Sequence, residues 1–393
     1  MINFFKGFIS NYYWIYVMSA LWVYVGLPDL YSYIIIIFTL SAIVLCHRSP
    51  IVLNTVDMMI ILFIIYQMVS CFFSDYRFEI YYYGVKAQVM PMVFYFIGRN
   101  VLFRRDNKFL DNMKYPMMFA FIVGLILYFW QPDWYIARRT MDLAQTASSN
   151  SYYEVTRLSS FWPWSYAMGY ASLYFIMYFS KDILVKRPQK VAYFYIITAI
   201  LVLFFSQQRV SIAFFILFIV IVSFFGKADK KSIVRLWMFI CIAFLFILIW
   251  LLNYADTDFI EYVLNRSVQA DENIVDQRFG MFDDFWNVTF LGEGLGKYGH
   301  AALMYNKLSV TDCEYIRLMA ELGIMGCTIF FLIYLKSIFR AFVYRKTFFF
   351  EFCLVSFFLA SMIGATPLEN HSMQPFLFWF CMGRINSPIL IKK

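Results

Sequence analysis

The residues of this chain best suited to chemistry are charged side chains that interrupt long apolar runs. Arg209 is the only charged residue in the 35-residue run from Val191 to Phe225. An ionisable group within or at the edge of a membrane segment is costly and is a functional hypothesis by default. Because two full spans and a turn need more residues than this run contains, we expect the turn at 206–209 to be recessed, with its guanidinium in a low-dielectric cleft. The alternative is an arginine that extends to lipid headgroups.

A second set of charges begins the apolar segment that follows residue 312. Glu314, Arg317 and Glu321 are spaced i, i+3 and i+7, which places them on one face of a helix. Thr311 and Glu314 also fit the S/T-x-x-E capping box, which explains Glu314 without any chemistry. A capping box requires neither Arg317 nor Glu321. The charged stripe is therefore either a structural ion pair or the wall of a catalytic site.

The segment before this stripe combines an aromatic face with a glycine-rich turn. Arg278 opens a run in which Phe279, Phe282 and Trp286 share one side at helical spacing, the pattern of a helix on a membrane surface. The alternate glycines of Gly292-Glu-Gly-Leu-Gly296 then permit a tight backbone turn. A turn of this kind is not by itself evidence for any function.

The elements that must position these residues follow from composition. Of the 393 residues, 62% are hydrophobic and 15% are charged, against about 45–50% and about 25% in soluble domains. We therefore predict an all-α, polytopic membrane protein, and we exclude a cytosolic enzyme, a DNA-binding domain and a secreted disulfide scaffold. The net charge of +8 does not indicate a nucleic-acid partner, because the basic residues gather in short loops on one side of the membrane.

Long apolar runs predict about twelve transmembrane helices, since about 20 apolar residues cross a bilayer. Residues 1–393 form one integral membrane domain in this prediction. The expected spans are 8–25, 30–46, 56–74, 80–97, 115–131, 160–180, 191–206, 209–225, 234–253, 313–335, 348–364 and 373–390.

The basic residues fix the expected orientation. With the N-terminus in the cytoplasm, the inner segments hold 22 of the 33 Lys and Arg, so both termini are predicted to be cytoplasmic. Two long outer segments result, Gln131–Ser159 and the 58-residue Tyr254–Thr311, and loops of this length are usually functional or disordered. Lys86 is expected within its span. Three arginines of the shorter outer loop are expected to contact solvent or headgroups: Arg138, Arg139 and Arg157.

Several common kinds of site are not expected. The three histidines are scattered, no glycine-rich phosphate loop occurs in the short inner loops, and no cysteine belongs to a C-x-x-C pair. We therefore expect no metal, no other cofactor, no disulfide framework and no ATP hydrolysis within this chain. The cysteines are Cys46, Cys71, Cys241, Cys313, Cys327, Cys353 and Cys381.

Three stretches, taken in order, resemble motifs of one family. Ser206-Gln-Gln-Arg209 is similar to an arginine-bearing turn that opens a span, and Arg278 with Trp286 precedes Leu291-Gly-Glu-Gly-Leu-Gly296, in which Leu291 stands where proline is frequent. The third stretch runs from Asp312 to Gly326. Together they resemble the O-antigen ligase and polymerase superfamily of bacterial polysaccharide assembly, over residues 206–326.

The third stretch bears on the choice within that superfamily. Ligases usually carry a His-Asn pair where this chain has Asp312-Cys313, and an acidic residue followed by Glu314-Tyr315 looks more like the Wzy-type O-antigen polymerases. His300, twelve residues upstream, is a possible displaced partner, so the ligase remains an alternative. The resemblance implies a GT-C-like glycosyltransferase architecture with a large helical periplasmic loop.

The resemblance also implies a reaction. Oligosaccharide repeat units of an O-antigen or capsule would pass from undecaprenyl diphosphate to the terminal sugar of another lipid-linked repeat unit, at the periplasmic face of the bacterial inner membrane. The transfer would be metal-independent and inverting. Arg209 and Arg278 would stabilise the departing diphosphate, since a guanidinium binds phosphate oxygens bidentately. Asp312 or Glu314 would be the base for the acceptor hydroxyl.

Partners and alternatives complete these expectations. The expected partners are the lipid-linked oligosaccharide, membrane lipid and a chain-length regulator, with no nucleic acid. One alternative is a ligase that transfers glycan to lipid A core, and another is a lipid-linked oligosaccharide flippase, whose site would lie near the bilayer midplane. The expected substrate-binding residues are Arg317, Tyr315, His300, Arg157 and Lys297.

Overall fold

The computed structural model describes most of the chain and resolves it into helices. The span predicted at 30–46 and the predicted site residues Arg278, His300 and Asp312 lie outside the described residues. The described ranges are 1–19, 53–73, 78–99, 106–137, 157–160, 165–184, 188–225, 230–254, 289–299, 313–363, 367–368 and 374–387.

No strand occurs in these ranges, so the all-helical class predicted from composition is confirmed for the described part of the chain. The α-helices are α1 (Ile2–Ser10), α2 (Trp14–Ser19), α4 (Thr55–Val69), α5 (Phe78–Gly84), α6 (Val93–Gly98), α7 (Asp106–Trp130), α10 (Ser165–Phe179), α11 (Lys190–Phe205), α12 (Arg209–Phe225), α13 (Lys230–Tyr254), α16 (Glu314–Val343), α17 (Arg345–Ser361) and α18 (Gln374–Asn386).

Shorter turns join some of these helices. A π-helix over Val85–Val89 and a 3-10 turn over Met90–Met92 connect α5 to α6, and further 3-10 turns follow α4 (Ser70–Phe73) and α10 (Ser180–Asp182). π-Helical turns are rare and occur frequently at functional sites. The segment between α5 and α6 is therefore an unusual feature of the apolar run predicted at 80–97.

Three helices among the described residues are long and apolar enough to cross a membrane, which supports membrane association. They are Thr55–Phe72, Lys108–Trp130 and Glu314–Val343, and shorter apolar helices cover Lys190–Phe205, Arg209–Phe225 and Thr347–Ser361.

Helices occupy the ten predicted ranges from 56–74 onward, but the first predicted span is not one helix. Tyr12 has a φ of 60°, which ends α1 and separates it from α2. Asn11 at this corner accepts a hydrogen bond from Lys108 at 2.6 Å, and its carbonyl accepts one from Asn112 at 2.6 Å. The corner is thus attached to the start of α7.

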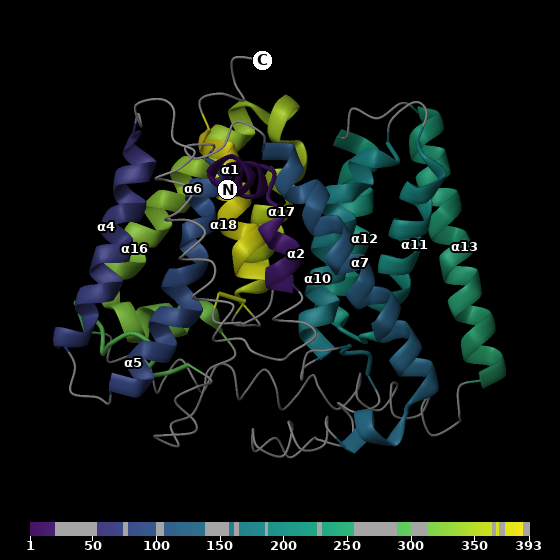
Figure 1. The fold of residues 1–393 in the computed structure, drawn as a ribbon, viewed down its shortest axis with the longest axis horizontal. Coiled ribbons are helices and arrows are strands. Elements are labelled where there is room, and N and C mark those ends of the chain that lie inside the picture. The colour runs from purple at the N-terminus through teal and green to yellow at the C-terminus, as the bar shows by residue number, and fades with distance from the viewer. Residues whose placement is uncertain are drawn as a thin grey trace.

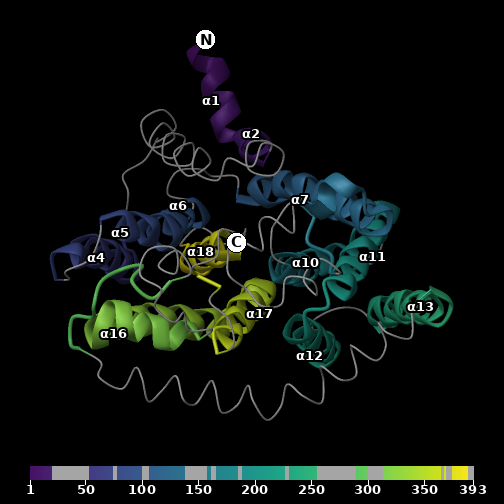
Figure 2. The same cartoon turned by 90° about the horizontal axis from the view of Figure 1, so that it is seen from below.

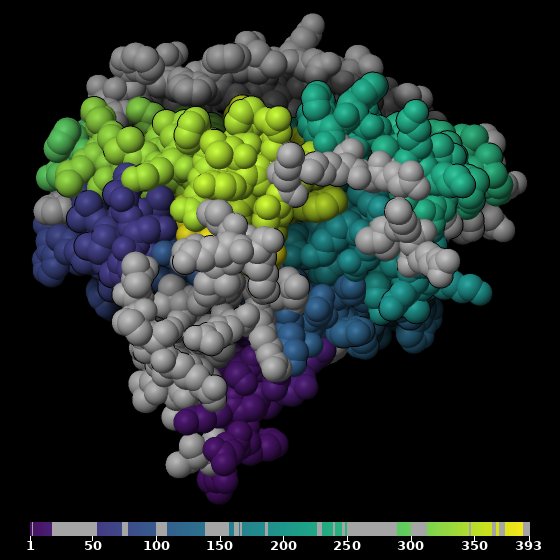
Figure 3. Space-filling view, turned by 90° about the horizontal axis from the view of Figure 1, so that it is seen from above, coloured from purple at the N-terminus to yellow at the C-terminus, as the bar shows by residue number. Residues whose placement is uncertain are grey.

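The long helices run side by side in two groups. Figure 1 and Figure 2 show α4, α6, α16, α17 and α18 on one side and α7, α10, α11, α12 and α13 on the other. α10 joins the groups, because it packs against α11 and α12 as well as α17 and α18. α1 lies across the direction of the bundle and projects from its side (Figure 3).

α6 and α18 approach each other most closely at two glycines. A Cβ atom on Gly98 would lie 2.0 Å from the carbonyl oxygen of Phe380, and one on Gly383 would lie 2.0 Å from that of Tyr95. Small residues allow helix backbones to meet in this way inside membranes. The sequence -FCMGRIN- of α18 is thereby fixed against α6.

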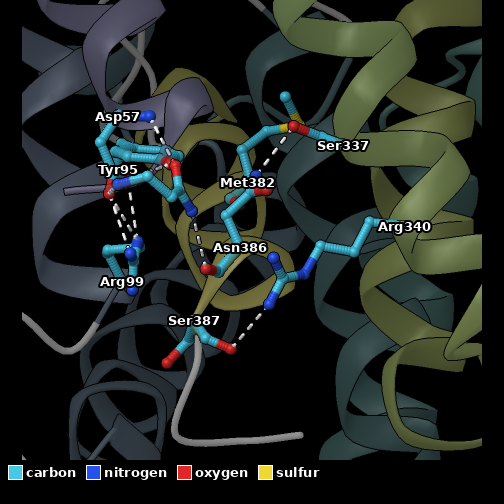
Figure 4. A network of polar contacts seen from close by, with 9 residues as sticks. Asp57, Tyr95, Arg99, Ser337, Arg340, Met382, Asn386 and Ser387 are labelled. Carbon is cyan, nitrogen blue, oxygen red and sulfur yellow. Dashed lines mark hydrogen bonds and ion pairs between the residues drawn. The ribbon is translucent and has the colours of Figure 1, made fainter. Parts of the chain in front are cut away.

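Buried polar groups connect the helix ends around α18 (Figure 4). Asn54 caps α4 in a capping box with Asp57, and the Asp57 carboxylate also accepts from Arg99 at 2.8 Å and from the Tyr95 hydroxyl at 2.6 Å. The Asn54 amide donates to the carbonyl of Asn386 at 3.4 Å. These contacts set the relative positions of α4, α6 and α18.

Candidate functional site

The glycine-rich turn predicted from the sequence is present. Gly292, Gly294 and Gly296 have φ values of 82°, 106° and 87°, a region that side-chain-bearing residues rarely adopt. Residues 289–299, which we call the glycine loop, therefore have a backbone conformation that is unfavourable for residues with a Cβ atom at these three positions. This loop packs against α16 and against the end of α5.

α16 is interrupted at Gly323, where φ is 63° and ψ is −172°. The interruption frees backbone groups on both sides, and buried groups of this kind must find partners. Two N–H groups of the glycine loop donate to the carbonyls of Ala320 and Glu321, at 2.9 and 3.0 Å. In return, Ile324 and Met325 donate to loop carbonyls at 3.4 and 3.2 Å. The loop thus replaces the helical hydrogen bonds that the break removes.

Tyr66 of α4 reinforces this junction. Its hydroxyl lies 2.8 Å from the carbonyl oxygens of both Leu291, in the loop, and Leu322, in α16. At the other side of the loop, a Cβ atom on Gly296 would lie 2.6 Å from the carbonyl oxygen of Ile80. The loop is therefore held between α4, α5 and α16, although Phe290 remains exposed.

A buried ionic network lies beside the junction. Arg317 donates to the carboxylates of both Glu314 and Glu321, the latter at 2.7 Å, and all three side chains are fully buried. The Glu321 carboxylate also accepts from the side chain of Gln88 at 2.7 Å and from the N–H of Tyr298 at 3.1 Å. The geometry favours the structural ion pair over the catalytic wall for this stripe.

The start of α16 is held by the segment that follows α17. The N–H of Glu314 donates to the carbonyl of Met362 at 2.9 Å, and its carboxylate accepts from the N–H of Leu368 at 3.2 Å. The capping residue of α16 is Cys313, which makes no side-chain cap. Thr311, the other member of the expected capping box, lies outside the described residues. The Glu314 carboxylate pairs with Arg317 and accepts from the N–H of Leu368.

Tyr315 faces a different direction from the stripe. Its hydroxyl donates to the carbonyl of Leu359 at 2.8 Å, and its ring stacks on that of Phe331. Tyr315 thus joins α16 to α17 in this structure. Its predicted role in substrate binding stays a prediction.

The glycine loop carries a small polar cluster of its own. The Glu293 carboxylate accepts from Lys297 at 2.5 Å and from the Tyr298 hydroxyl at 2.6 Å. Although partial burial acts to raise it, these hydrogen bonds lower the pKa of Glu293 below its usual value. Burial and the same carboxylate raise the pKa of Tyr298. Lys297, a predicted substrate-binding residue, is half-buried and neutralised by Glu293.

Arg209 is the first residue of α12, as its place in the sequence predicts. The preceding turn contains Ser206, which is buried, and Gln207, which is partly buried and has a φ of 53°. This turn packs on α10, where a Cβ atom on Gly169 would lie 2.6 Å from Cβ of Gln208. Arg209 itself is exposed, so the recess expected for this turn holds for Ser206 and not for the guanidinium.

The exposed guanidinium of Arg209 coincides with a helix N-terminus. The N–H groups of the first turn and the helix dipole both favour negative charge at such an end. An arginine at this position adds a planar fork that fits phosphate or carboxylate oxygens. The arrangement is suited to binding an anion.

Arg157 lies next to this turn, although it is distant in sequence. The N–H of Leu158 donates to the carbonyl of Phe205 at 3.0 Å, so the chain at Arg157 runs beside the residues that precede Arg209. Arg157 is buried, which is contrary to the expectation that it contacts solvent or headgroups. The contact between the two segments joins residues about 50 positions apart, and local patterns do not reveal it.

The described site residues therefore form two groups. One group contains Arg157 and Arg209, and the other contains Lys297, Glu314 and Arg317. Tyr315 is next to Glu314 in the chain but contacts α17 instead. α17 connects them: it packs against α12 through a ring contact of Phe214 with Phe357, and the segment at its end holds α16. Gln88 and Tyr66, which contact Glu321 and the glycine loop, were not predicted as site residues. The sequence feature that could have indicated them is a polar side chain within an apolar run.

No group of three or more His, Cys, Asp or Glu that could hold a metal ion occurs in the described ranges. Comparisons of this chain with models of protein families, with curated proteins and with solved structures find no match. The assignment of function therefore depends on the residues of this chain and on their arrangement.

Proposed function

We propose that this protein is a polysaccharide polymerase of the bacterial inner membrane with about twelve spans and a GT-C-like architecture. It transfers oligosaccharide repeat units of an O-antigen or capsule from undecaprenyl diphosphate to the terminal sugar of another lipid-linked repeat unit. The bond between the anomeric carbon and the phosphate oxygen breaks, and the acceptor oxygen bonds to that carbon. The acceptor proton passes to a carboxylate, for which Asp312 is the candidate.

The observation that carries this proposal is the exposed Arg209 at the N-terminus of α12. The departing diphosphate gains negative charge as the sugar–phosphate bond breaks, and preorganised charge stabilisation is usually the largest catalytic contribution. Arg209 supplies a guanidinium and the positive end of a helix at one point, without a metal. The neighbouring chain at Arg157 brings a second arginine to the same end of α12.

A flippase for lipid-linked oligosaccharides is the second candidate, because α16 is a discontinuous helix. Transporter sites are often built where helices break near the bilayer midplane. In this chain, however, the glycine loop occupies the backbone groups freed at Gly323, so they are not available to a substrate. The break also lies nine residues from the start of a 30-residue helix. Both features favour the polymerase.

Replacement of Arg209 tests the proposal in cells that lack their own copy of the protein. We expect Arg209→Ala to leave single-repeat products, with a loss of activity of about 10²–10³-fold, as for the removal of one charge-stabilising group. Arg209→Lys keeps the charge but not the planar fork and should give shortened chains. The measurement is the distribution of polysaccharide lengths on a gel.

Arg345→Ala is the matched control, since Arg345 is an exposed arginine at the start of α17 and should leave the lengths unchanged. Wild-type lengths in Arg209→Ala would contradict the polymerase proposal. Complete loss of polysaccharide attached to lipid A core, with lipid-linked chains still long, would indicate the ligase instead.

A further inference from the structure

α1 does not follow the direction of the long helices. It lies across the bundle and projects from its side (Figure 1, Figure 2 and Figure 3). Tyr12, with a φ of 60°, separates α1 from α2, and α2 packs against α7. The segment predicted as one span at 8–25 therefore contains a helix that leaves the bundle and a helix that follows it.

The corner between α1 and α2 lies at one end of α7. Asn11 accepts hydrogen bonds from Lys108 and Asn112, in the first two turns of α7, and the ring of Tyr12 packs edge-on against that of Phe109. α7 is one of the helices long and apolar enough to cross a membrane, so its start is close to a membrane–water interface. α1 therefore leaves the bundle at the level of that interface.

α1 is amphipathic, and the bundle covers only part of its apolar side. At helical spacing its apolar and polar residues occupy opposite sides. They are Phe4, Phe5, Phe8 and Ile9 on one side, and Asn3, Lys6 and Ser10 on the other. Near the corner, Ile9 is buried and Phe8 is partly buried against the bundle. Farther from the corner, Phe4 is 74% exposed and Phe5 is 46% exposed.

We propose that α1 is an interfacial helix whose apolar side inserts into one lipid leaflet, with Phe4 and Phe5 among the acyl chains and Lys6 at the headgroups. Amphipathic helices of this kind lie in the plane of the membrane surface. Under the predicted orientation, the leaflet is the cytoplasmic one. The inference goes beyond the proposed function and does not depend on the reaction that the protein catalyses.

The charge and the aromatic residues of this region fit phospholipid headgroups. Residues 1–19 contain Lys6 and no Asp or Glu, so they attract anionic headgroups and carry no charge that such headgroups repel. Tyr13 and Tyr16 are exposed beside the corner, and tyrosine is enriched where membrane meets water. Both features agree with the level at which α1 leaves the bundle.

The length of α1 also requires a cover for its exposed half. Helices shorter than about 12–15 residues are marginal in water, and α1 has nine residues. The neighbouring elements expose apolar side chains too, such as Val17 of α2 and Phe119 of α7. Lipid that surrounds α2 and α7 is continuous with the space beside Phe4 and Phe5, so it covers them without a further partner.

Photo-crosslinking of the full chain in vesicles of phosphatidylethanolamine and phosphatidylglycerol tests the proposal. Phe4→p-benzoylphenylalanine keeps an aromatic ring and bonds to neighbouring C–H groups on illumination. Mass spectrometry then measures the fraction of protein that gains the mass of one phospholipid. We expect this fraction to be at least about fivefold higher than for Asn3→p-benzoylphenylalanine, because the polar side of an interfacial helix faces water.

A lipid-facing position gives the reference for this measurement. Phe119 is exposed within a candidate membrane span, and the fraction labelled from Phe4 should be within about threefold of that from Phe119, as for two rings among acyl chains. Equal labelling from Phe4 and Asn3 would overturn the proposal. A crosslink from Phe4 to a second copy of the chain, seen as a dimer on a denaturing gel, would overturn it as well.

Hydrogen exchange of the α1 amides gives a second readout that needs no crosslinker. In the same vesicles, Phe4→Ser should speed this exchange by about tenfold or more, because the burial of one phenylalanine by lipid is lost and local opening becomes easier. Lys6→Gln is the matched control on the polar side and should leave the exchange rate unchanged. Equal exchange in Phe4→Ser and wild type would overturn the insertion of Phe4 into lipid.

Discussion

At the scale of residues, Arg209 and Arg317 were both predicted to belong to the site, but their surroundings in the structure differ. Arg209 is exposed at the N-terminus of α12, whereas Arg317 is fully buried between two carboxylates. A phosphate could reach Arg317 only after its ion pairs were broken, and breaking a buried pair is strongly unfavourable. Under the proposed function, Arg209 is therefore the candidate for binding the anion, whereas Arg317 is held by its ion pairs with Glu314 and Glu321.

The hydrogen bonds of Glu293 with Lys297 and Tyr298 should make the stability of the folded protein depend on pH. The pKa of Glu293 is lowered in the folded protein, so its contribution is present above the usual value of 4.5 and is lost as pH falls through the lowered value. Wild type should unfold at a higher temperature than Glu293→Gln near pH 7, and this difference should disappear in acid. Thermal unfolding of both proteins from pH 7 to pH 3 measures it, and a constant difference would contradict the assignment.

The site residues show what local sequence patterns can and cannot predict. The start of α12 at Arg209 follows from the apolar run, the charged face of Glu314, Arg317 and Glu321 follows from periodicity, and the structure has both. The contact of the Arg157 segment with the Arg209 turn was not predicted, because it joins residues far apart in sequence. Gln88 was missed for the same reason, since its partner is 233 positions away.

At the scale of elements, the junction of the glycine loop with α16 depends on Gly323. The sequence predicts one continuous apolar helix at 313–335, and periodicity contains no sign of a break. The break is stable because another segment, residues 289–299, supplies the missing hydrogen bonds. The three glycines of the loop were predicted to form a turn, but the packing of that turn against α16 was not predicted.

Replacement of Gly323 should disrupt this junction. At a φ of 63° and a ψ of −172°, side-chain-bearing residues are strained by about 1–3 kcal/mol, and a Cβ atom would lie 2.3 Å from the backbone nitrogen of Gly292. Gly323→Ala should therefore lower the unfolding temperature by several degrees and expose the glycine loop to protease.

Gly7→Ala is the control for this substitution. Gly7 lies within α1, and a Cβ atom there would have no neighbour within 4 Å. Alanine is favoured over glycine inside helices by up to about 1 kcal/mol, so Gly7→Ala should be neutral or slightly stabilising. An unfolding temperature for Gly323→Ala equal to that of Gly7→Ala would show that the break in α16 is not as described.

At the scale of the whole molecule, composition predicted the all-helical fold class, and the apolar runs predicted the ranges of most helices. Helices occupy ten of the predicted ranges, because runs of apolar residues with matching length leave little choice of secondary structure. The span predicted at 8–25 is instead interrupted at Tyr12. The corner there between α1 and α2 is set by contacts of Asn11 with α7. Such a corner depends on tertiary contacts that hydropathy does not contain.

The proposed orientation gives a further prediction. A fluorescent protein fused after Lys393 should fluoresce, and a phosphatase that is active only in the periplasm should be active when inserted between Tyr254 and Thr311, because most basic residues lie in the other loops. Activity of a phosphatase inserted at 226–229, between α12 and α13, is the internal control and should be absent. The reverse pattern would invert the proposed topology.

The most direct test of the central claim is chain extension by the purified protein in lipid vesicles. Lipid-linked repeat units would be supplied without metal or nucleotide, and the products separated by length. We expect a ladder of lipid-linked chains that grows with time in wild type and is lost in Arg209→Ala. Folded wild-type protein that never lengthens these units, or an Arg209→Ala protein that lengthens them at the wild-type rate, would contradict the account.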